Sequence, residues 1–554
     1  MACAALARRL ALTVLASLIG AGSLPAEDYI RDLQNAAISA KTAEWGYWGP
    51  EPKNYVGWTS HSNRLIPVYT FGTLGGGKGV DLTSYTGEHS PYRSETAIKK
   101  IYGKLPPDTL NPKADYLDQT NIFDIQRAAA DAGKKYIFLV IFDGMDWQST
   151  RNAAINAQGA VKYDSGRGTG LHFLDYTAGG TTQFGYMCTS PFDNGTDGDP
   201  DTQTIVKLGD LFGGYNAELG GPNAWAAGKD PQYIIAKNKE GAKHAYTDSS
   251  SSATSMTAGV KIYNNSVNVD VTGAQVTTIA HLLQEQGRSV GAVSSVQIAH
   301  ATPACSYAHN VGRDDYQDIS RDLLGLKSIS HPETPLPGLD VVIGTGYGGQ
   351  RSKDGGGQGK NFVPGNPVLT DADRAAVDVK HGGKYVVSER TAGQSGTAKL
   401  LADAEHAAAN GQRLLGFYGV AETDHLPFAT ADGDYMPANG VKGKAETYTP
   451  ADLAENPKLS DMTAAAITVL SKNPKGFWLM VESGDVDWAN HDDNIDNSIG
   501  AVKSGDAAVK TITDWVEKNS NWKESVLIVT ADHGHYFNLT KPEVLIVPTK
   551  TADR

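Results

Sequence analysis

The chain has 554 residues, of which 40% are hydrophobic and 20% charged, and this balance is typical of a folded globular protein. Its formal net charge of −13 argues against nucleic acid or an anionic membrane surface as the main partner. An anionic substrate would need local positive charge in such a protein, and bound metal ions would supply it.

The N-terminus has the features of a secretory signal peptide, expected to span residues 1–26. Two arginines at positions 8 and 9 precede the apolar run Leu10–Gly20, and small residues before position 27 offer a cleavage site. The run is short for a bilayer span, so we expect export to the periplasm or the exterior without stable membrane insertion. After cleavage Cys188 and Cys305 would remain, which allows one disulfide at most.

The first strong strand signal is Tyr136–Phe142, an apolar run that leads into Asp143. Further along, the segment Thr247–Gly259 places Ser249 after an acidic residue and before small residues that suit a helix. A serine at a helix N-terminus is close to free backbone N–H groups that stabilise an anion, and phosphate is the natural candidate. Taken alone, the same segment also fits a solvated Ser/Thr-rich loop.

Residues from about 314 to 475 are expected to form an elaborated insertion, because their middle is rich in Gly, Asp and Pro. A second buried strand, Phe477–Val481, follows and leads into Glu482. Asp487 and His491 come next, four positions apart, so they share one face if this segment is helical. A carboxylate and an imidazole on one face make a partial zinc site.

A third apolar run, Val526–Ala531, leads into Asp532 and His533, which offer the same pair of ligand types. Helical stretches, such as Ser460–Lys472 and Ile499–Lys518, lie between the strands. The alternation predicts a single α/β domain over residues 27–554. We expect a three-layer sandwich with a large, mainly parallel central sheet, flanking helices and loop-rich insertions. The acids would then meet at the carboxyl ends of the strands, where such sheets bind ligands.

Six motifs in order resemble the alkaline phosphatase family. They are Phe142–Met145, the Asp248-Ser249 run with Gly259–Asn264, His300–Ala304, Ala308–Arg313, Glu482–His491 and Thr530–His535. The resemblance implies a hydrolase of small-molecule phosphomonoesters with two zinc ions and one magnesium ion. In line with the net charge, we expect no nucleic-acid partner, and a homodimer stays open.

The resemblance also implies a role for each matching residue. Ser249 would be the nucleophile that becomes a phosphoserine, and Arg313 would bind the phosphate through its guanidinium group. The implied ligand sets are Asp143, Asp532 and His533 for one zinc, Asp143, Thr302 and Glu482 for magnesium, and Asp487, His491 and one further histidine for the second zinc.

The further histidine departs from the family pattern, in which it lies well downstream of the Asp-His pair. Here the short tail after His533 holds only His535. The N-terminal segment Trp58–Gly72, which contains His61, resembles the family's C-terminal histidine segment and its strand. Residues Tyr116–Ile125 resemble the family's closing helix.

We interpret the chain as a circular permutation in which residues 27–135 are the family's C-terminal segment moved to the front. His61 would then complete the second zinc site. If His61 is instead an ordinary loop histidine, His535 or His425 would have to serve, or the site would be incomplete.

Two positions near the implied magnesium site differ from some relatives, which carry an acid where this chain has His300 and a lysine where it has Trp488. His300 is expected to contact a magnesium-bound water or the phosphate. Two alternatives to a phosphomonoesterase stay open. One is a phosphodiesterase or sulfatase of the same superfamily, and the other is a relative that binds metal or phosphate without catalysis.

Overall fold

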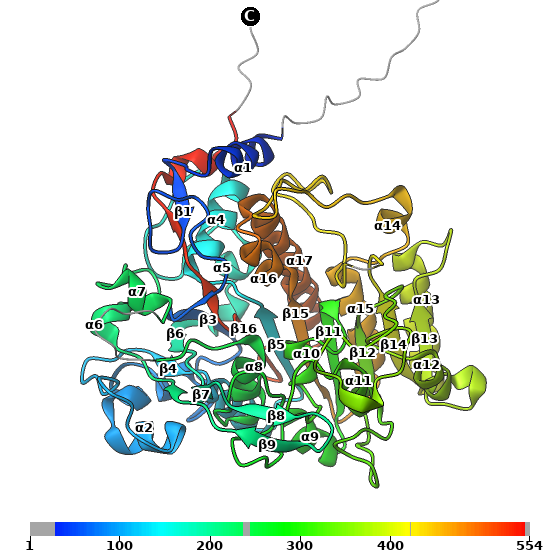
Figure 1. Ribbon diagram of the computed structural model, residues 1–554. Coiled ribbons are helices and arrows are strands. Elements are labelled where there is room, and N and C mark those ends of the chain that lie inside the picture. Colours follow the sequence, from blue (N-terminus) through cyan, green and yellow to red (C-terminus); the bar gives the residue numbers. More distant parts are fainter. Residues whose placement is uncertain (1–27, 237–243, 422, 549–554) are drawn as a thin grey trace, which may run out of the picture.

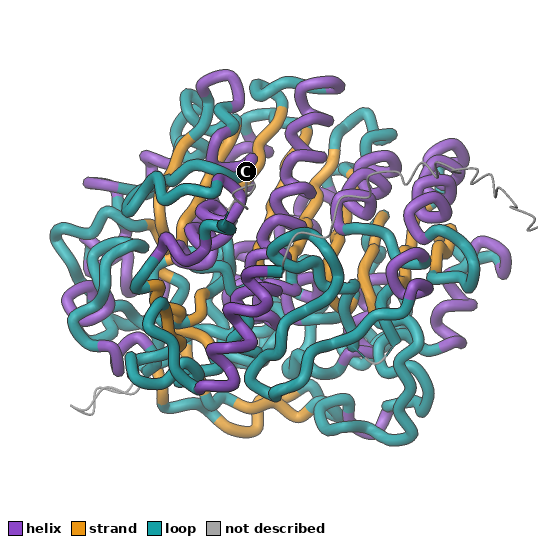
Figure 2. Tube along the Cα trace, turned by 90° about the horizontal axis from the view of Figure 1, so that it is seen from above, coloured by secondary structure: helices purple, strands orange, loops and turns teal. Residues whose placement is uncertain are grey.

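The computed structural model describes residues 28–236, 244–421 and 423–548, so the expected signal peptide lies outside the described residues. A ten-stranded sheet crosses the molecule, with helices packed against it (Figures 1 and 2). The expected α/β class with a mainly parallel central sheet is confirmed.

One strand of the sheet, β3 (Ile66–Phe71), runs in the direction opposite to the others. The strands of the sheet, in spatial order, are β13 (Tyr385–Glu389), β14 (Arg413–Tyr418), β12 (Val341–Thr345), β11 (Ser289–Gln297), β15 (Phe477–Ser483), β5 (Tyr136–Phe142), β16 (Ser525–Thr530), β3, β6 (Gln183–Cys188) and β4 (Leu117–Asp118). Neighbouring strands are parallel except where β3 pairs with β16 and with β6. All other strands therefore point their carboxyl ends to one edge.

The central strands form because their sequences are continuous apolar runs that can be buried on both faces. β5 has the bounds expected from the sequence, and the whole of β16 is buried. β15 is longer than expected and continues to Ser483, so Glu482 lies within the strand rather than after it. Glu482 is nevertheless the last residue but one of the strand, so it lies near the same carboxyl edge of the sheet as the acids after β5 and β16.

Two layers of helices cover the sheet (Figures 1 and 2). Neighbouring helices pack side by side on one face: α13 (Gly396–Asn410), α15 (Leu459–Leu470), α17 (Ile495–Asn519) and α4 (Trp147–Gln158). The other face carries a second group: α3 (Thr120–Asp131), α8 (Ser249–Ala258) and α9 (Ile279–Glu285). The sandwich thus encloses the apolar side chains of the central strands.

The segment expected to be an insertion, residues 314–475, contributes three strands to the central sheet: β12, β13 and β14. These strands form one edge of the sheet, and α13 and α15 pack on them. Their apolar runs are short, and the Gly-rich loops between them dominate the composition of the segment. The segment therefore combines part of the central sheet and its helix layer with long loops.

The N-terminal region joins the same sheet through β3, which runs antiparallel to β16 with Val68 opposite Thr530. The start of β3 thus lies at the carboxyl end of β16. The short strand β2 (His61–Ser62) precedes β3 and pairs with β17 (Gly534–His535). This reversal carries the N-terminal segment to the edge where the other strands end.

Near the two ends of the described chain, β1 (Gly46–Trp48) pairs with β18 (Phe537–Leu539), and α1 (Tyr29–Ala40) lies close to the C-terminal segment (Figure 1). In the described ranges, none of the helices has both the length and the apolar character needed to cross a bilayer.

Candidate active site

The sequence-predicted site residues converge at the carboxyl edge of the sheet. Asp143 follows β5, Glu482 is the last residue but one of β15, and Asp532 lies just after the end of β16. Thr302 lies in α10 (Ala301–Ala304), directly after β11. Asp487 and the histidine four positions later lie on α16 (Asp485–His491), so this segment is helical, as their shared face requires.

Ser249 is the first residue of α8 and is buried. The helix starts here because Asp248 caps it: its carboxylate accepts the backbone N–H of Ser251 at 2.9 Å. The Ser249 hydroxyl lies 3.1 Å from Nε2 of His533 and 3.4 Å from Oδ1 of Asp143. A nucleophile-type oxygen is therefore held at a helix N-terminus beside two ligand-type groups.

Three oxygens expected to bind magnesium are buried without a hydrogen bond to another described residue: Oδ2 of Asp143, Oγ1 of Thr302 and Oε1 of Glu482. The other Glu482 oxygen accepts the hydroxyl of Ser294, which fixes the carboxylate. Burial raises the pKa of Glu482 to about 8. Burial, followed by the charge of Asp532, raises the pKa of Asp143 well above its ordinary value. Unpartnered oxygens of this kind suit a hard cation.

Asp143, Asp532 and His533 also bring their ligand atoms within 4.8 Å of one another. Nε2 of His533 lies 3.1 Å from Oδ1 of Asp143 and 3.5 Å from Oδ2 of Asp532. Burial, followed by the charge of His61, holds the pKa of His533 well below its ordinary value. The ring is thus neutral, which is the form that binds a metal ion.

His61 and His491 face each other with their Nε2 atoms 3.1 Å apart. Nδ1 of His61 lies 2.9 Å from the carbonyl oxygen of Thr247, and Nδ1 of His491 lies 2.5 Å from that of Thr59. A carbonyl can only accept, so each Nδ1 carries the proton and each Nε2 presents a lone pair. Two lone pairs that face each other need a cation or a proton between them.

Asp487 lies beside the same two histidines, His61 and His491. Its Oδ1 lies 3.5 Å from Nε2 of His61 and 3.4 Å from Nε2 of His491. Burial alone would raise the pKa of Asp487, but the charge of His491, followed by His535 and His61, holds it well below its ordinary value. The carboxylate is therefore ionised and available as a ligand.

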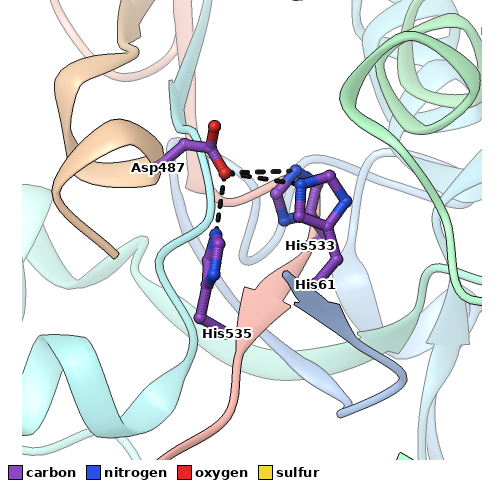
Figure 3. Close-up of side chains that lie close together, drawn as sticks. All are labelled: His61, Asp487, His533 and His535. Atoms are coloured by element: carbon purple, nitrogen blue, oxygen red, sulfur yellow. Dashed lines mark hydrogen bonds and ion pairs between the residues drawn. The ribbon is translucent and has the colours of Figure 1, made fainter. Parts of the chain in front are cut away.

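His535 is a member of the site that sequence reasoning named only as a substitute. Its Nε2 lies 2.7 Å from Oδ1 of Asp487. Figure 3 shows Asp487 facing His535 on one side and the stacked rings of His61 and His533 on the other. The signal in the sequence was the spacing of two between the histidines at positions 533 and 535. In an extended segment that spacing directs both side chains to one side.

Arg313 and Ser249 line the same cavity, which has a volume of about 1050 Å³. One of its nitrogens donates to Asp248 at 3.0 Å and the other lies 3.4 Å from Nε2 of His300. Burial, followed by the charge of Arg313, lowers the pKa of His300 to about 3, so this ring is neutral. Trp488 lines the same cavity, with its ring 5.8 Å from that of His300.

The structure also places the remaining residues that the sequence analysis left open. His425 contacts Glu446, with 3.2 Å between Nε2 and the carboxylate, and lies outside the group around Asp487. Cys188 and Cys305 are both buried free thiols. At the cavity rim, Lys442 and Lys444 are lining residues that the motifs had not indicated.

Comparison with known proteins indicates the family to which the chain belongs. The alkaline phosphatase family model matches residues 229–549. Alkaline phosphatase 4 of Bacillus subtilis is 29% identical over 304 residues, which are 55% of this chain and 50% of that protein. Alkaline phosphatase of Escherichia coli is 31% identical over 328 residues, which are 56% of this chain and 62% of that protein. The matched part thus spans about half to three-fifths of these curated relatives.

Among solved structures, a cold-active alkaline phosphatase from Shewanella sp. superposes with a TM-score of 0.40 at 20% identity, covering 72% of this chain and 68% of that one. A variant of the TAB5 alkaline phosphatase with bound Mg superposes with a TM-score of 0.40 at 18% identity, covering 73% and 79%. Because the family model matches more than half of the residues, the chain belongs to the alkaline phosphatase family.

Proposed function

We propose that this protein hydrolyses phosphate monoesters through a phosphoserine on Ser249. The observation that best supports this proposal is the position of the Ser249 hydroxyl. It lies at the N-terminus of α8, 3.1 Å from His533, and Arg313 lines the same cavity. Nucleophile, anion-binding helix end and guanidinium group therefore face one space, as phosphoryl transfer requires.

The donor sets fit the metal ions that the family implies. Three unpartnered buried oxygens, on Asp143, Thr302 and Glu482, suit magnesium. Mixed nitrogen and oxygen sets suit zinc: Asp143, Asp532 and His533 for one ion, and His61, Asp487 and His491 for the other. When bound, the ions supply the positive charge that favours the ionised hydroxyl and stabilises the oxygens of the phosphate.

The remaining chemistry is carried out by side chains of this chain. Arg313 donates N–H groups to the phosphate and is itself oriented by Asp248. The Ser249 hydroxyl gives its proton to solvent and its oxygen attacks phosphorus, while the bond from phosphorus to the alcohol oxygen breaks and the alkoxide takes a proton from water. Water then attacks the phosphoserine, the bond from phosphorus to the Ser249 oxygen breaks, a proton of that water returns to the serine oxygen, and inorganic phosphate leaves. Neutral His300 accepts from Arg313 and thereby holds the guanidinium against the cavity wall.

Substitution of the nucleophile tests the proposal. Ser249→Ala should lower turnover of p-nitrophenyl phosphate by at least about a thousandfold, since the covalent route is lost. Its zinc and magnesium content should stay that of the wild type. Phosphate label attached to the Ser249→Ala protein in acid-stable form would contradict the assignment.

The alternative activities are separated by the substrate. Wild-type protein loaded with zinc and magnesium should release p-nitrophenol from the phosphate monoester faster than from the bis ester or the sulfate. Preference for the bis ester would indicate a phosphodiesterase, and preference for the sulfate would indicate a sulfatase. Binding of phosphate without turnover of any ester would indicate a relative that has lost catalysis.

We further propose that the chain is circularly permuted, with residues 27–135 as the relocated C-terminal segment of the family. Three observations support this. The family model matches from residue 229 onward. His61 lies at the site although it is far from the other ligands in the sequence. A short turn after α3 leads directly into β5, and β1 pairs with β18 near the two chain ends.

Reversing the permutation tests this proposal. A chain that runs from residue 134 to 548, then through a short Gly-Ser linker into residues 28–133, should fold and keep the wild-type zinc content. The control has the same joined ends but opens in the exposed Gly-rich loop at residues 354–357. If the control folds and binds zinc while the reversed chain does not, the proposal fails.

A further inference from the structure

A second group of metal-ligand side chains lies away from the catalytic cavity. His309, Asp322 and His331 bring their ligand atoms within 4.8 Å of one another, and none of the three lines that cavity. His309 follows α10, Asp322 belongs to α11 (Tyr316–Leu324), and His331 lies in the loop after it. Three separate segments therefore converge on one point.

The tautomer of His309 is fixed by a backbone contact. Its Nε2 lies 3.0 Å from the carbonyl oxygen of Val276, and because a carbonyl can only accept, Nε2 carries the proton. Nδ1 then presents a lone pair. This atom is buried and makes no hydrogen bond to another described residue. An unpartnered buried acceptor destabilises a fold unless something binds to it.

The carboxylate of Asp322 is held in place from two sides. It accepts the backbone N–H of His309 at 3.0 Å and the hydroxyl of Ser328. Nδ1 of His331 lies 3.0 and 3.1 Å from its two oxygens. His331 is thus close enough either to donate a proton to the carboxylate or, once deprotonated, to share a metal ion with it.

His281 packs beside this group but is no ligand in this arrangement. Its ring stacks on that of His309 at 5.3 Å, and its Nδ1 lies 3.2 Å from the backbone nitrogen of Thr278. Nδ1 accepts that N–H, so the proton is on Nε2 and no lone pair faces the group. His281 therefore forms a wall of the site.

We propose that His309, Asp322 and His331 bind one zinc-type divalent cation, through Nδ1 of each histidine and one carboxylate oxygen. Two imidazoles and a carboxylate suit zinc, with water in the fourth position, and they suit magnesium or calcium poorly. The Nε2–H contact of His309 with a backbone carbonyl is the supporting contact that metal-binding histidines make. This site is independent of the proposed hydrolysis.

The position of the site indicates a structural role. Residue 310, next to His309, pairs with Val267 through the backbone, and its side chain donates to Asp315. This segment continues to Arg313. A cation on His309 and Asp322 would fasten the start of the segment to α11, and its removal would loosen the segment rather than remove a reacting group.

Metal content and diffraction test the proposal on the full chain. Crystals grown with zinc should show an anomalous peak at the zinc edge within about 2.0–2.2 Å of both Nδ1 atoms and of an Asp322 oxygen. In solution, His331→Gln should bind one zinc per chain fewer than the wild type at saturation. His406→Gln is the matched control, because His406 lies on the surface of α13 and contacts Asn410 there. It should bind the wild-type amount.

His331 is chosen because it is partly exposed, whereas Asp322 and His309 are buried. Circular dichroism checks that the variant folds, and if it does not, the anomalous map of the wild type decides alone. Absence of the peak at saturating zinc, or equal zinc content in wild type and folded His331→Gln, would overturn the proposal. Neither readout depends on turnover, so a protein that fails to hydrolyse esters would leave this result unaffected.

Discussion

Two sets of buried acids in this protein differ in where their oxygens point. At the active site, Asp143 and Glu482 each keep one oxygen without a hydrogen bond to a described residue. Asp496, at the start of α17, is equally buried, but its two oxygens accept the backbone N–H groups of Ala431 and Ala438 at 3.0 and 3.2 Å. Burial raises the pKa of Asp496 to about 7 and that of Glu482 to about 8.

A raised pKa therefore does not by itself distinguish a functional acid from a structural one. The difference is in the hydrogen bonds. The active-site oxygens lie close together without a donor from a described residue, whereas both oxygens of Asp496 accept backbone N–H groups. The first group should destabilise the protein until a cation binds, and the second should not respond to metal at all. The following variants test that distinction.

Asp143→Asn should have the largest effect, and its sign should depend on metal. With zinc and magnesium present, turnover should fall by at least about a thousandfold, because the charge stabilisation supplied by the ions is worth several kcal/mol. In chelator, the melting temperature at neutral pH should rise above that of the wild type, because a carboxyl whose raised pKa opposes folding at this pH is replaced by a neutral amide. Calorimetry in both conditions checks this. A lower melting temperature in chelator would contradict the comparison.

His61→Gln should lose one zinc per chain and about a hundredfold or more in turnover, since a metal ligand is removed. His425→Gln is the matched control, because His425 is also buried near the cavity but contacts Glu446 instead of Asp487. It should keep the wild-type zinc content. Elemental analysis of both variants measures the difference, and equal zinc loss in the two would remove His61 from the ligand set.

Arg313→Ala should weaken inhibition by inorganic phosphate by about 1.5–3 kcal/mol, the range for lost charged hydrogen bonds. That corresponds to roughly a 10–150-fold rise in the inhibition constant. Lys442→Ala, at the cavity rim, is the control for general loss of positive charge and should change it less. An unchanged inhibition constant in Arg313→Ala would exclude direct contact with phosphate.

Asp496→Asn should leave turnover unchanged and alter only the pH dependence of stability. The folded carboxyl, with its pKa raised from 3.8 to about 7, holds its proton more tightly than the unfolded one. Its contribution is therefore greatest below about pH 4 and is lost as the pH rises through 7. Across that window the wild type should lose up to about 4 kcal/mol relative to the variant. Urea unfolding at pH 4.5 and pH 7.5 measures this, and parallel curves would contradict it.

Sequence reasoning predicted the strand ends of the sheet because long apolar runs and the acids after them leave a local signal. It placed β5 at its observed bounds and Ser249 at a helix start. It missed that Glu482 lies within β15, because an acid in a strand resembles a strand end when only composition is read. It also did not resolve β12, β13 and β14, whose runs are short and separated by long loops.

The parts of the site that depend on distant pairing left weaker signals. His535 lies opposite His61 because β17 pairs with β2, and no local pattern encodes that pairing. The group around His309 was also invisible, since its members lie on three segments and only folding brings them together. The resemblance to a family supplied roles for single residues, whereas these two clusters required the geometry.

The placement of β16 has a consequence for biosynthesis. It lies between β5 and β3, so the last strand of the ten-stranded sheet to be translated is inserted between two strands translated early. A growing chain leaves that position empty until nearly all residues have been translated. His61 is among the first site residues to emerge, and Asp532, His533 and His535 are the last. Capture of the metal ion that we propose for Asp143, Asp532 and His533 would therefore be tied to completion of the polypeptide, and a truncated chain would lack both the closing strand and two of the ligands of that ion.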